Sequence, residues 1–196
     1  MSNIFLLDNF DSFTYNLVDQ LRCLGHTVII YRNNININIL LQKIKQIHNP
    51  ILILSPGPGI PKNAGYMPYL LQILIGKMPI IGICLGYQAL IELYNGTIMP
   101  LNNILHGQAT PITHDMKHMF KNIKNPMYVA RYHSLIVKNM PQMFTINSRY
   151  KNIIMSFRYE KKKICGYQFH PESILTPEGS ILLEQTIIWA SNYYLL

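Results

Sequence analysis

The sequence predicts an α/β fold, with a mostly parallel central sheet flanked by helices and an additional strand-rich second half. In the first half, short apolar runs alternate with longer amphipathic segments, which is the pattern of strand–helix–strand units. Beyond Gly96 the helical period fades, and short strand-like runs follow one another. No repeat or flexible linker divides the chain, so we expect a single domain over residues 1–196.

The first half contains four expected strands, each a short apolar run bounded by turn residues: 4–7, 26–31, 51–54 and 80–83. A helix is expected after the first strand, with Asp11 and Ser12 as candidate caps and Gly25 as its end. Another helix is expected over 85–94, where apolar residues recur at helical spacing. The asparagine-rich segment 33–38 is expected to be a surface loop.

The second half contains further expected strands, around Val129 and at 135–137, 144–146, 153–157 and 164–169. A last helix is expected from about Pro177, because proline is tolerated in a first helical turn, where its missing N–H is harmless. The lysine run 161–163 follows Glu160 and is expected to form a solvated hairpin turn.

Composition narrows the class of protein. Hydrophobic residues make up 49% of the chain and charged residues 13%, which suits one compact interior. No window reaches the roughly 18 apolar residues that a membrane span needs, and no basic region precedes an apolar stretch at the start. We therefore expect a cytoplasmic protein without a membrane partner. The formal charge of +8 comes from scattered residues rather than from a basic cluster. Codon drift in an AT-rich genome would raise the lysine content and explain this charge. We therefore expect no nucleic-acid partner.

Three cysteines, Cys23, Cys84 and Cys165, form neither a disulfide framework nor a zinc motif, and no metal is expected. Cys84 stands where an expected strand meets a helix, with glycines two residues away on each side. This is the G-x-nucleophile-x-G elbow with cysteine in place of serine. A helix N-terminus favours the thiolate, which is the form that attacks a carbonyl carbon. A buried structural thiol is the alternative interpretation.

A histidine and a carboxylate follow the last expected strand. His170 and Glu172 are two residues apart, so strand geometry places both side chains on one face. A thiol nucleophile needs a base, and the base needs an acceptor that orients it, so Cys84, His170 and Glu172 can supply the three roles of a triad. Taken alone, His170 is more typical of an ordinary strand-end histidine. The joint pattern predicts catalysis.

The segment 55–59, Ser-Pro-Gly-Pro-Gly, follows a strand expected to be parallel to the one that precedes the cysteine elbow. Both connections then open at the carboxyl edge of the sheet, where ligands bind in such folds. Backbone N–H groups there can hold the oxyanion formed during attack on a carbonyl. Leu85 offers one donor, and Gly57 is the candidate for the second, with Gly59 in reserve, because Pro58 has no N–H. An ordinary proline-glycine turn is the alternative.

These three motifs, in this order, resemble those of class I glutamine amidotransferases, which release ammonia from glutamine. Other stretches carry the same resemblance: Leu-Leu-Asp-Asn-Phe-Asp-Ser-Phe-Thr-Tyr-Asn-Leu-Val-Asp at 6–19, His106-Gly107, and Arg-Tyr-His-Ser-Leu-Ile at 131–136. The chain is most similar to the glutaminase component of anthranilate synthase, component II, and the corresponding component of aminodeoxychorismate synthase is a close cousin. The similarity runs almost end to end.

The resemblance implies that L-glutamine lies over Cys84, among the residues Gly57, Pro58, Gly59, Leu85, Gln88, Ser134 and Leu135. It implies no cofactor in this chain, whereas the partner synthase subunit is expected to need Mg²⁺. That partner, anthranilate synthase component I, converts chorismate, and the two chains are expected to form a heterodimer or heterotetramer in tryptophan biosynthesis. Without the resemblance, Ser134 is an ordinary strand-edge serine, and His133 has no assigned role.

Three residues depart from the family pattern: Tyr87 replaces the more usual histidine, Gln108 a lysine and Met116 a glycine. None belongs to the expected triad, so hydrolysis is expected to survive while local turn geometry or partner contacts differ. Three alternative functions stay open. They are the glutaminase of folate precursor synthesis, alone or in both pathways; a non-catalytic docking subunit; and a nucleic-acid binder, which would bind tightly and in a salt-sensitive manner.

Overall fold

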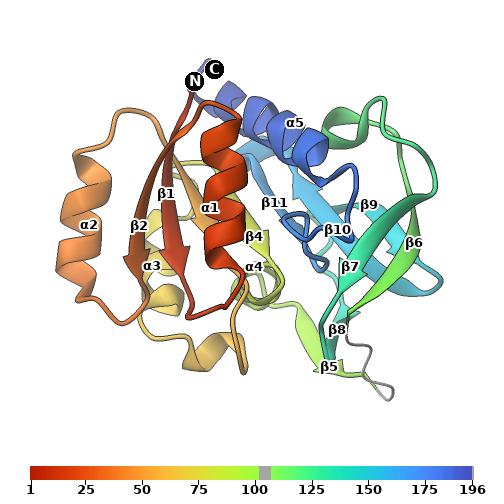
Figure 1. Ribbon diagram of the computed structural model, residues 1–196. Helices are drawn as coiled ribbons and strands as arrows, with labels where there is room; N and C mark the ends of the chain where they lie inside the picture. Colours follow the sequence, from red (N-terminus) through yellow and green to blue (C-terminus); the bar gives the residue numbers. More distant parts are fainter. Residues whose placement is uncertain (102–106, 196) are drawn as a thin grey trace.

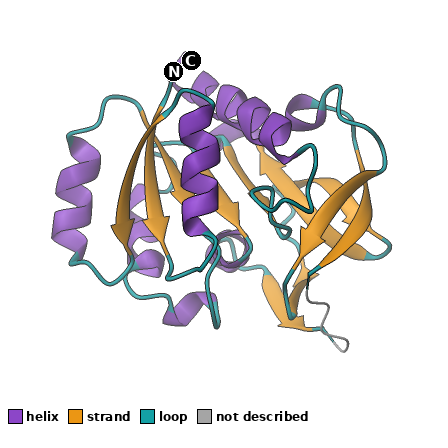
Figure 2. Cartoon of the chain, in the orientation of Figure 1, coloured by secondary structure: helices purple, strands orange, loops and turns teal. Residues whose placement is uncertain are grey.

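The computed structural model describes residues 1–101 and 107–195, except for the side chain of Gln108. His106, which the resemblance singles out, lies outside the described residues. Figure 1 shows the order of the elements, and Figure 2 shows helices on both faces of a central sheet. The predicted fold class is confirmed.

A sheet of nine strands runs through the molecule in the order β2-β1-β3-β4-β11-β10-β9-β6-β7. Its parallel part consists of β1 (Asn3–Asp8), β2 (Thr27–Arg32), β3 (Pro50–Leu54), β4 (Ile80–Ile83) and β11 (Ile164–Tyr167). Its antiparallel part consists of β10 (Ile153–Tyr159), β9 (Thr145–Tyr150), β6 (Gln108–His114) and β7 (Met127–Arg131). A separate ribbon pairs β5 (Thr97–Pro100) with β8 (Leu135–Asn139).

The helices are α1 (Thr14–Cys23), α2 (Ile37–Lys45), α3 (Met67–Leu74), α4 (Leu85–Leu93) and α5 (Gly179–Ser191). Short 3₁₀ turns occur at Pro61–Asn63, His118–Phe120, Glu160–Lys162 and Asn192–Leu195. Among the described residues, none of these helices has the length and apolar character needed to cross a bilayer.

The core lies in two layers, one on each face of the sheet. Successive side chains of a strand point to opposite faces, and β1 follows this rule. Ile4 and Leu6 belong to the buried cluster that includes α1 and α5, whereas Phe5 and Leu7 belong to the cluster that includes α2, α3 and α4. Because both faces are covered, the strand is apolar throughout, as a parallel sheet requires.

The asparagine-rich segment is not the simple surface loop that its composition predicts. Asn33 is only 5% exposed, because its side-chain amide donates to Asn9 Oδ1 at 3.0 Å. Asn36 caps α2, since its side-chain oxygen accepts the Asn38 N–H at 2.9 Å. The segment therefore contains a helix start and a buried tether.

The first and last helices begin later than predicted. The Asp11 carboxylate accepts the Phe13 N–H at 2.7 Å in the preceding turn, and α1 starts at Thr14 without a side-chain cap. At the other end of the chain, Pro177 lies outside α5, because residues 176–179 form a turn in which the Gly179 N–H donates to the Thr176 carbonyl. The segments that precede α1 and α5 are thus hydrogen-bonded turns.

The lysine run does connect β10 to β11, but it is not fully solvated. Lys163 is 7% exposed, pairs with Glu160 and lies 5.0 Å from the centre of the Trp189 ring. The indole N–H of Trp189 donates to the other Glu160 oxygen at 2.9 Å. The expected solvent-exposed turn is therefore wrong at Lys163, whose charge fixes the hairpin against α5.

Candidate active site

Cys84 occupies the turn between β4 and α4 in the conformation that the elbow motif predicts. Its φ and ψ angles are 50° and −97°, values that a non-glycine residue adopts rarely and at an energetic cost. Close packing maintains this turn. A Cβ on Gly86 would lie 2.5 Å from the Leu54 Cβ, so only glycine lets α4 approach β3 so closely. The thiol stands at the N-terminus of α4, at the carboxyl edge of the sheet.

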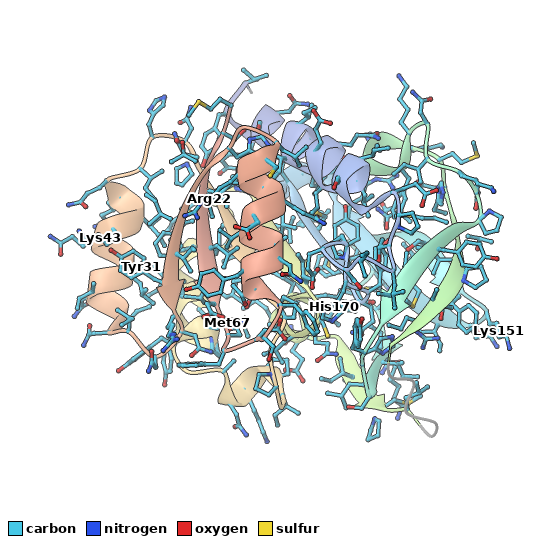
Figure 3. The ribbon with its side chains drawn as sticks, viewed as in Figure 1. Arg22, Tyr31, Lys43, Met67, Lys151 and His170 are labelled. Carbon is cyan, nitrogen blue, oxygen red and sulfur yellow. The ribbon has the colours of Figure 1, made fainter. Side chains whose placement is uncertain are left out.

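His170 lies just beyond β11, and Figure 3 places it between the parallel strands and the antiparallel part of the sheet. Its N–H donates to the Ala130 carbonyl of β7 at 3.1 Å, while the Thr176 hydroxyl donates to its carbonyl at 2.7 Å. The His170 Nδ1 lies 2.6 Å from Glu172 Oε1, and both residues are 3% exposed. The carboxylate thus fixes the orientation of a buried imidazole.

The electrostatics of this cluster favour a charged histidine. Burial lowers the pKa of His170, but the adjacent Cys84 and Glu172 outweigh burial and hold the pKa well above its usual value. The Nε2 atom, which is not used by Glu172, has no hydrogen-bond partner of good geometry among the described residues. It is therefore available to exchange a proton with the sulfur or with a substrate.

A cavity of about 160 Å³ opens beside the cysteine. Its lining consists of Gly57, Pro58, Gly59, Cys84, Gln88, Tyr132, His133, Ser134 and Leu135. Every predicted binding residue except Leu85 is in this set. Residues from three separate parts of the sequence thus meet around one space, next to the nucleophile.

A buried polar network positions the loop at 55–59, and the sequence analysis did not identify it. The Asn9 N–H donates to Ser55 Oγ at 2.8 Å, and the Asn9 side-chain amide donates to the Ser55 carbonyl at 2.9 Å. Asn33 completes the network through Asn9. Each of these polar groups is buried, so losing a partner would leave an unpaired group at a cost of about 1–3 kcal/mol.

Gly57 brings the two expected oxyanion donors together. A Cβ at this position would lie 2.7 Å from the Asn9 Cβ and 2.8 Å from Leu85 Cδ2, so no larger residue fits. Neither the Gly57 nor the Leu85 N–H donates a hydrogen bond within the described part of the chain. Both donors are therefore free for a ligand.

We expect Gly57→Ala to lower kcat of the amide hydrolysis that the resemblance implies by about 10²–10³-fold, because the loop must move and withdraw one expected oxyanion donor. The matched control is Gly25→Ala, where a Cβ meets nothing within 4 Å but φ is +83°. That control should lose about 1 kcal/mol of stability and keep its kcat. Steady-state kinetics and urea unfolding of both variants test this; equal kcat losses would contradict it.

His133, unassigned from the sequence, is buried and neutral. Its Nδ1 lies 2.9 Å from the Leu135 carbonyl, and the Arg131 Nε–H donates to its Nε2 at 3.1 Å. Nε2 therefore accepts, Nδ1 carries the proton, and the ring holds the Leu135 backbone at the cavity. Burial and the nearby Arg131 charge lower the pKa of His133 to about 4.

This lowered pKa predicts a pH-dependent stability. Between pH 6.5 and about 4 the unfolded chain protonates His133 and the folded chain does not, so stability falls as the pH drops through this window. The contribution of this residue amounts to about 3 kcal/mol. His133→Asn should therefore flatten the pH dependence of urea unfolding, while the exposed His48→Asn should not. Parallel curves for wild type and His133→Asn would contradict the assignment.

Arg131 was also missed, although it lies in the 131–136 stretch. It is fully buried, with Tyr150 4.9 Å below its guanidinium, and both terminal nitrogens lack a partner among the described residues. Burial lowers its pKa. Tyr132, which follows it, lines the cavity and packs edge-on to His170 at 5.0 Å. Successive side chains of an extended segment point to opposite sides. This alternation could have indicated that Arg131 and Tyr132 have different surroundings.

Gln168 is a further residue that the sequence analysis missed. It is fully buried, and its side-chain amide contacts Cys84 and Gln88. It precedes His170 by two residues, so the same strand periodicity that pairs His170 with Glu172 could have indicated it.

Two of the three departures have structural explanations. Tyr87 is fully buried, and its hydroxyl donates to the Ile154 carbonyl at 3.0 Å, so it joins α4 to β10. Met116 has φ of +57°, and its N–H donates to His114 Nδ1 at 3.2 Å, so a methionine here adopts a conformation that favours glycine. The side chain of Gln108 lies outside the described part of the structure.

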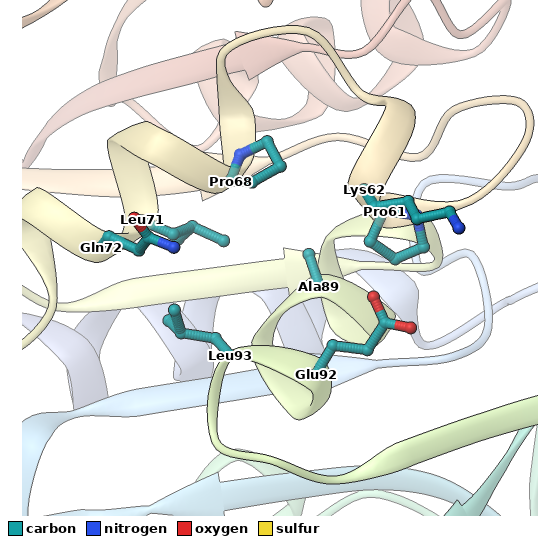
Figure 4. A pocket seen from close by; sticks show the side chains of 8 residues that line it. All are labelled: Pro61, Lys62, Pro68, Leu71, Gln72, Ala89, Glu92 and Leu93. Atoms are coloured by element: carbon teal, nitrogen blue, oxygen red, sulfur yellow. The ribbon is translucent and has the colours of Figure 1, made fainter.

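A second pocket, of about 170 Å³, is distinct from the site (Figure 4). Its lining comes from the Pro61–Asn63 turn, α3 and α4, and comprises Pro61, Lys62, Pro68, Leu71, Gln72, Ala89, Glu92 and Leu93. None of the predicted site residues lines it. Of these two cavities, only the one beside Cys84 is lined by predicted site residues.

The family profile described as glutamine amidotransferase class-I matches residues 5–190. The chain is 55% identical to anthranilate synthase component 2 of Buchnera aphidicola subsp. Schizaphis graminum, with 99% of each chain covered. It is 50% identical to anthranilate synthase component 2 of Vibrio parahaemolyticus, with 97% of each covered.

Solved structures show the same fold at lower identity. A Thermoplasma acidophilum protein described as a GMP synthase subunit has a TM-score of 0.86 at 22% identity, covering 100% of this chain and 96% of that one. A glutamine amidotransferase of Thermotoga maritima has a TM-score of 0.75 at 14% identity, covering 97% and 98%. The overall fold is thus shared with proteins of much lower sequence identity.

Proposed function

Because the chain belongs to the class I glutamine amidotransferase family, we propose that it is the glutaminase subunit of anthranilate synthase. In this role residues 1–196 form one domain that hydrolyses L-glutamine and passes the ammonia to a synthase subunit in the cytoplasm. The observation that carries the proposal is the cavity next to Cys84, with the buried His170–Glu172 pair beside it. The similarity to anthranilate synthase component 2 proteins supports the choice of pathway.

The proposed reaction begins with attack of the Cys84 thiolate on the side-chain carbonyl carbon of glutamine. The N–H groups of Gly57 and Leu85 hold the oxyanion, and His170 protonates the departing ammonia. The raised pKa of His170 supports this step, because an imidazolium must be present to give up the proton. Water, activated by the same histidine, then hydrolyses the glutamyl thioester to glutamate.

Gln88, Ser134, Leu135 and the loop at 57–59 form the proposed glutamine site. They line one cavity, although the sequence separates them widely. The Leu135 carbonyl is already fixed by His133, so it offers a preorganised backbone group to the substrate. Preorganisation of this kind reduces the free-energy cost of binding.

Exposed apolar side chains on two segments that adjoin site residues support docking of a synthase subunit. Ile174 is 94% exposed, two residues after Glu172, and Leu175 is also exposed. Phe13 is 42% exposed and stacks on the cavity residue Tyr132 at 5.7 Å. Exposed apolar patches mark interaction sites, and a partner here would enclose the ammonia as it leaves. We propose a heterodimer or heterotetramer with anthranilate synthase component I.

Product analysis tests the pathway. The chain is mixed with chorismate, Mg²⁺ and either anthranilate synthase component I or the synthase subunit of the folate branch, with glutamine or with ammonium as the nitrogen source. The proposal predicts glutamine-dependent anthranilate with the first partner. Glutamine-dependent aminodeoxychorismate with the second partner alone would assign the chain to folate synthesis. Product from ammonium alone with both partners would indicate a non-catalytic docking subunit.

A further inference from the structure

We propose that Thr176 is a positioning residue for His170, because its hydroxyl joins the backbone of that histidine to β7. The inference rests on the proposed glutaminase function and adds to it a residue outside the cavity lining that sets the place of the catalytic base. Thr176 is 4% exposed. Its hydroxyl accepts the Ala130 N–H at 3.0 Å and donates to the His170 carbonyl at 2.7 Å. Both distances are typical of well-formed hydrogen bonds.

The hydroxyl replaces one bond of a strand pairing. His170 and Ala130 form an antiparallel bridge outside the named strands. A hydrogen-bonded antiparallel pair normally exchanges two N–H···O=C bonds. One of them is direct here, from the His170 N–H to the Ala130 carbonyl at 3.1 Å. The other passes through the Thr176 hydroxyl, which is therefore built into the bridge.

This bridge closes the antiparallel part of the sheet. The strands follow the order β11-β10-β9-β6-β7, and His170 lies three residues after the end of β11. The outer edge of β7 thus meets the segment of chain that leaves β11. The N–H and C=O groups of an edge strand need partners when they are buried. At Ala130, Thr176 and His170 supply both partners.

The two reacting side chains are held by different parts of the sheet. The Cys84 N–H donates to the Tyr167 carbonyl at 2.8 Å, so the backbone of the nucleophile is fixed to the end of β11. The backbone of His170 is fixed to β7 instead. Without the Thr176 hydroxyl, two buried backbone groups would lose their shared partner, and the bridge would have to shift. A displacement of about 1 Å at a reacting group can lower a rate by roughly 10²-fold.

The backbone of Thr176 is itself fixed on both sides. Its N–H donates to the Ser173 carbonyl at 2.9 Å, and its carbonyl accepts the Gly179 N–H at 2.9 Å. Gly179 begins α5, and a Cβ there would lie 1.9 Å from the Pro171 carbonyl oxygen. The start of α5 is therefore packed tightly against the residue that follows His170. Rigid support of this kind is what precise placement of a catalytic group requires.

The first test is steady-state glutamine hydrolysis by the complex with the synthase subunit. Thr176→Val keeps the shape of the side chain without the hydroxyl, and kcat should fall by about 10–100-fold. Thr176→Ser keeps the hydroxyl, so its kcat should stay close to that of wild type. A Thr176→Val protein with wild-type kcat, or a Thr176→Ser protein as impaired as Thr176→Val, would overturn the proposal.

Thr186→Val is the matched control, because it separates positioning from stability. Thr186 is likewise buried, on α5, where its hydroxyl donates to the Leu182 carbonyl at 2.6 Å and contacts the Tyr167 hydroxyl. Both valine variants should lower the Tm by about 2–10 °C, because each leaves buried polar groups unpaired. Only Thr176→Val should lower kcat. Equal losses of kcat in the two variants would indicate general damage and overturn the proposal.

The pH profile is a measurement that a purely structural role would not change. Burial lowers the pKa of His170, and its contacts with Cys84 and Glu172 raise that pKa above its usual value. A displaced imidazole loses part of these contacts, so its pKa moves downwards. In Thr176→Val, the activity that depends on protonated His170 should therefore decline at a lower pH than in wild type or in Thr186→Val. An unshifted profile would contradict the positioning role.

Alkylation of Cys84 by iodoacetamide, followed in its peptide, does not depend on turnover. A nearby imidazolium favours the reactive thiolate, so alkylation at neutral pH should slow in Thr176→Val but not in Thr186→Val. The exposed Cys23 is the internal reference in the same samples. Unchanged or faster alkylation of Cys84 would overturn the inference. If wild type fails to hydrolyse glutamine, the proposed function fails, and this measurement still decides the role of Thr176.

Discussion

Cys84→Ser should abolish glutamine hydrolysis, with a fall in kcat of about 10⁶-fold, as when a triad nucleophile is lost. Serine is similar in size to cysteine, but its hydroxyl ionises far less readily than a thiol. Cys84 also helps to raise the pKa of His170, and a neutral hydroxyl would not replace this effect. Glutamate release with the synthase subunit bound is the measurement. Ammonium-dependent product formation should be unaffected, because that reaction needs only the partner.

The control for this variant is Cys23→Ser. Cys23 is exposed at the end of α1, far along the chain from the site residues, and the substitution changes the same atoms. It should keep wild-type glutaminase activity. A Cys84→Ser protein that still released glutamate at a rate near that of wild type would remove the cysteine from the mechanism.

The second large effect is expected for Glu172→Gln, which should lower kcat by about 10²–10⁴-fold. The amide can still contact His170 Nδ1, but it carries no charge, so it supports the imidazolium less. The negative charge of Glu172 helps to raise the pKa of His170, and its loss moves that pKa downwards. Less of the histidine is then protonated at neutral pH, and departure of ammonia slows.

The pH profile distinguishes this cause from damage to the fold. For Glu172→Gln, the activity that depends on protonated His170 should decline at a lower pH than in wild type. Glu184→Gln, an exposed glutamate on α5, is the matched control and should leave the profile unchanged. A variant with reduced kcat but an unshifted profile would argue against the electrostatic role.

The fold class could be predicted because the periodicity of the sequence is local. The strand Ile80–Ile83 and the helix that starts at Leu85 were expected within one residue of their bounds, since an unbroken apolar strand and a glycine-flanked corner leave few alternatives. The helix Met67–Leu74 was not predicted. Its sequence is short and apolar almost throughout, and periodicity alone does not distinguish such a run from a buried strand.

The candidate triad came from short motifs, and the structure brings these residues together. The residues that hold them in place were not predicted, because their roles depend on partners distant in sequence. Composition predicts a surface loop at Asn33, because its burial depends on Asn9, which in turn contacts Ser55, and both are distant in sequence. Thr176 likewise gains a role only when β7 is placed beside His170. Sequence patterns identify reactive groups more readily than the groups that position them.

The most direct test of the account is to trap the covalent intermediate. The complex with the synthase subunit is mixed with glutamine, quenched in acid within the turnover time, digested and analysed by mass spectrometry. We expect one glutamyl group on the peptide that contains Cys84, absent from Cys84→Ser and from samples without glutamine. Rapid glutamate release with no adduct on Cys84, or with the adduct on Cys23 or Cys165, would contradict the proposed mechanism.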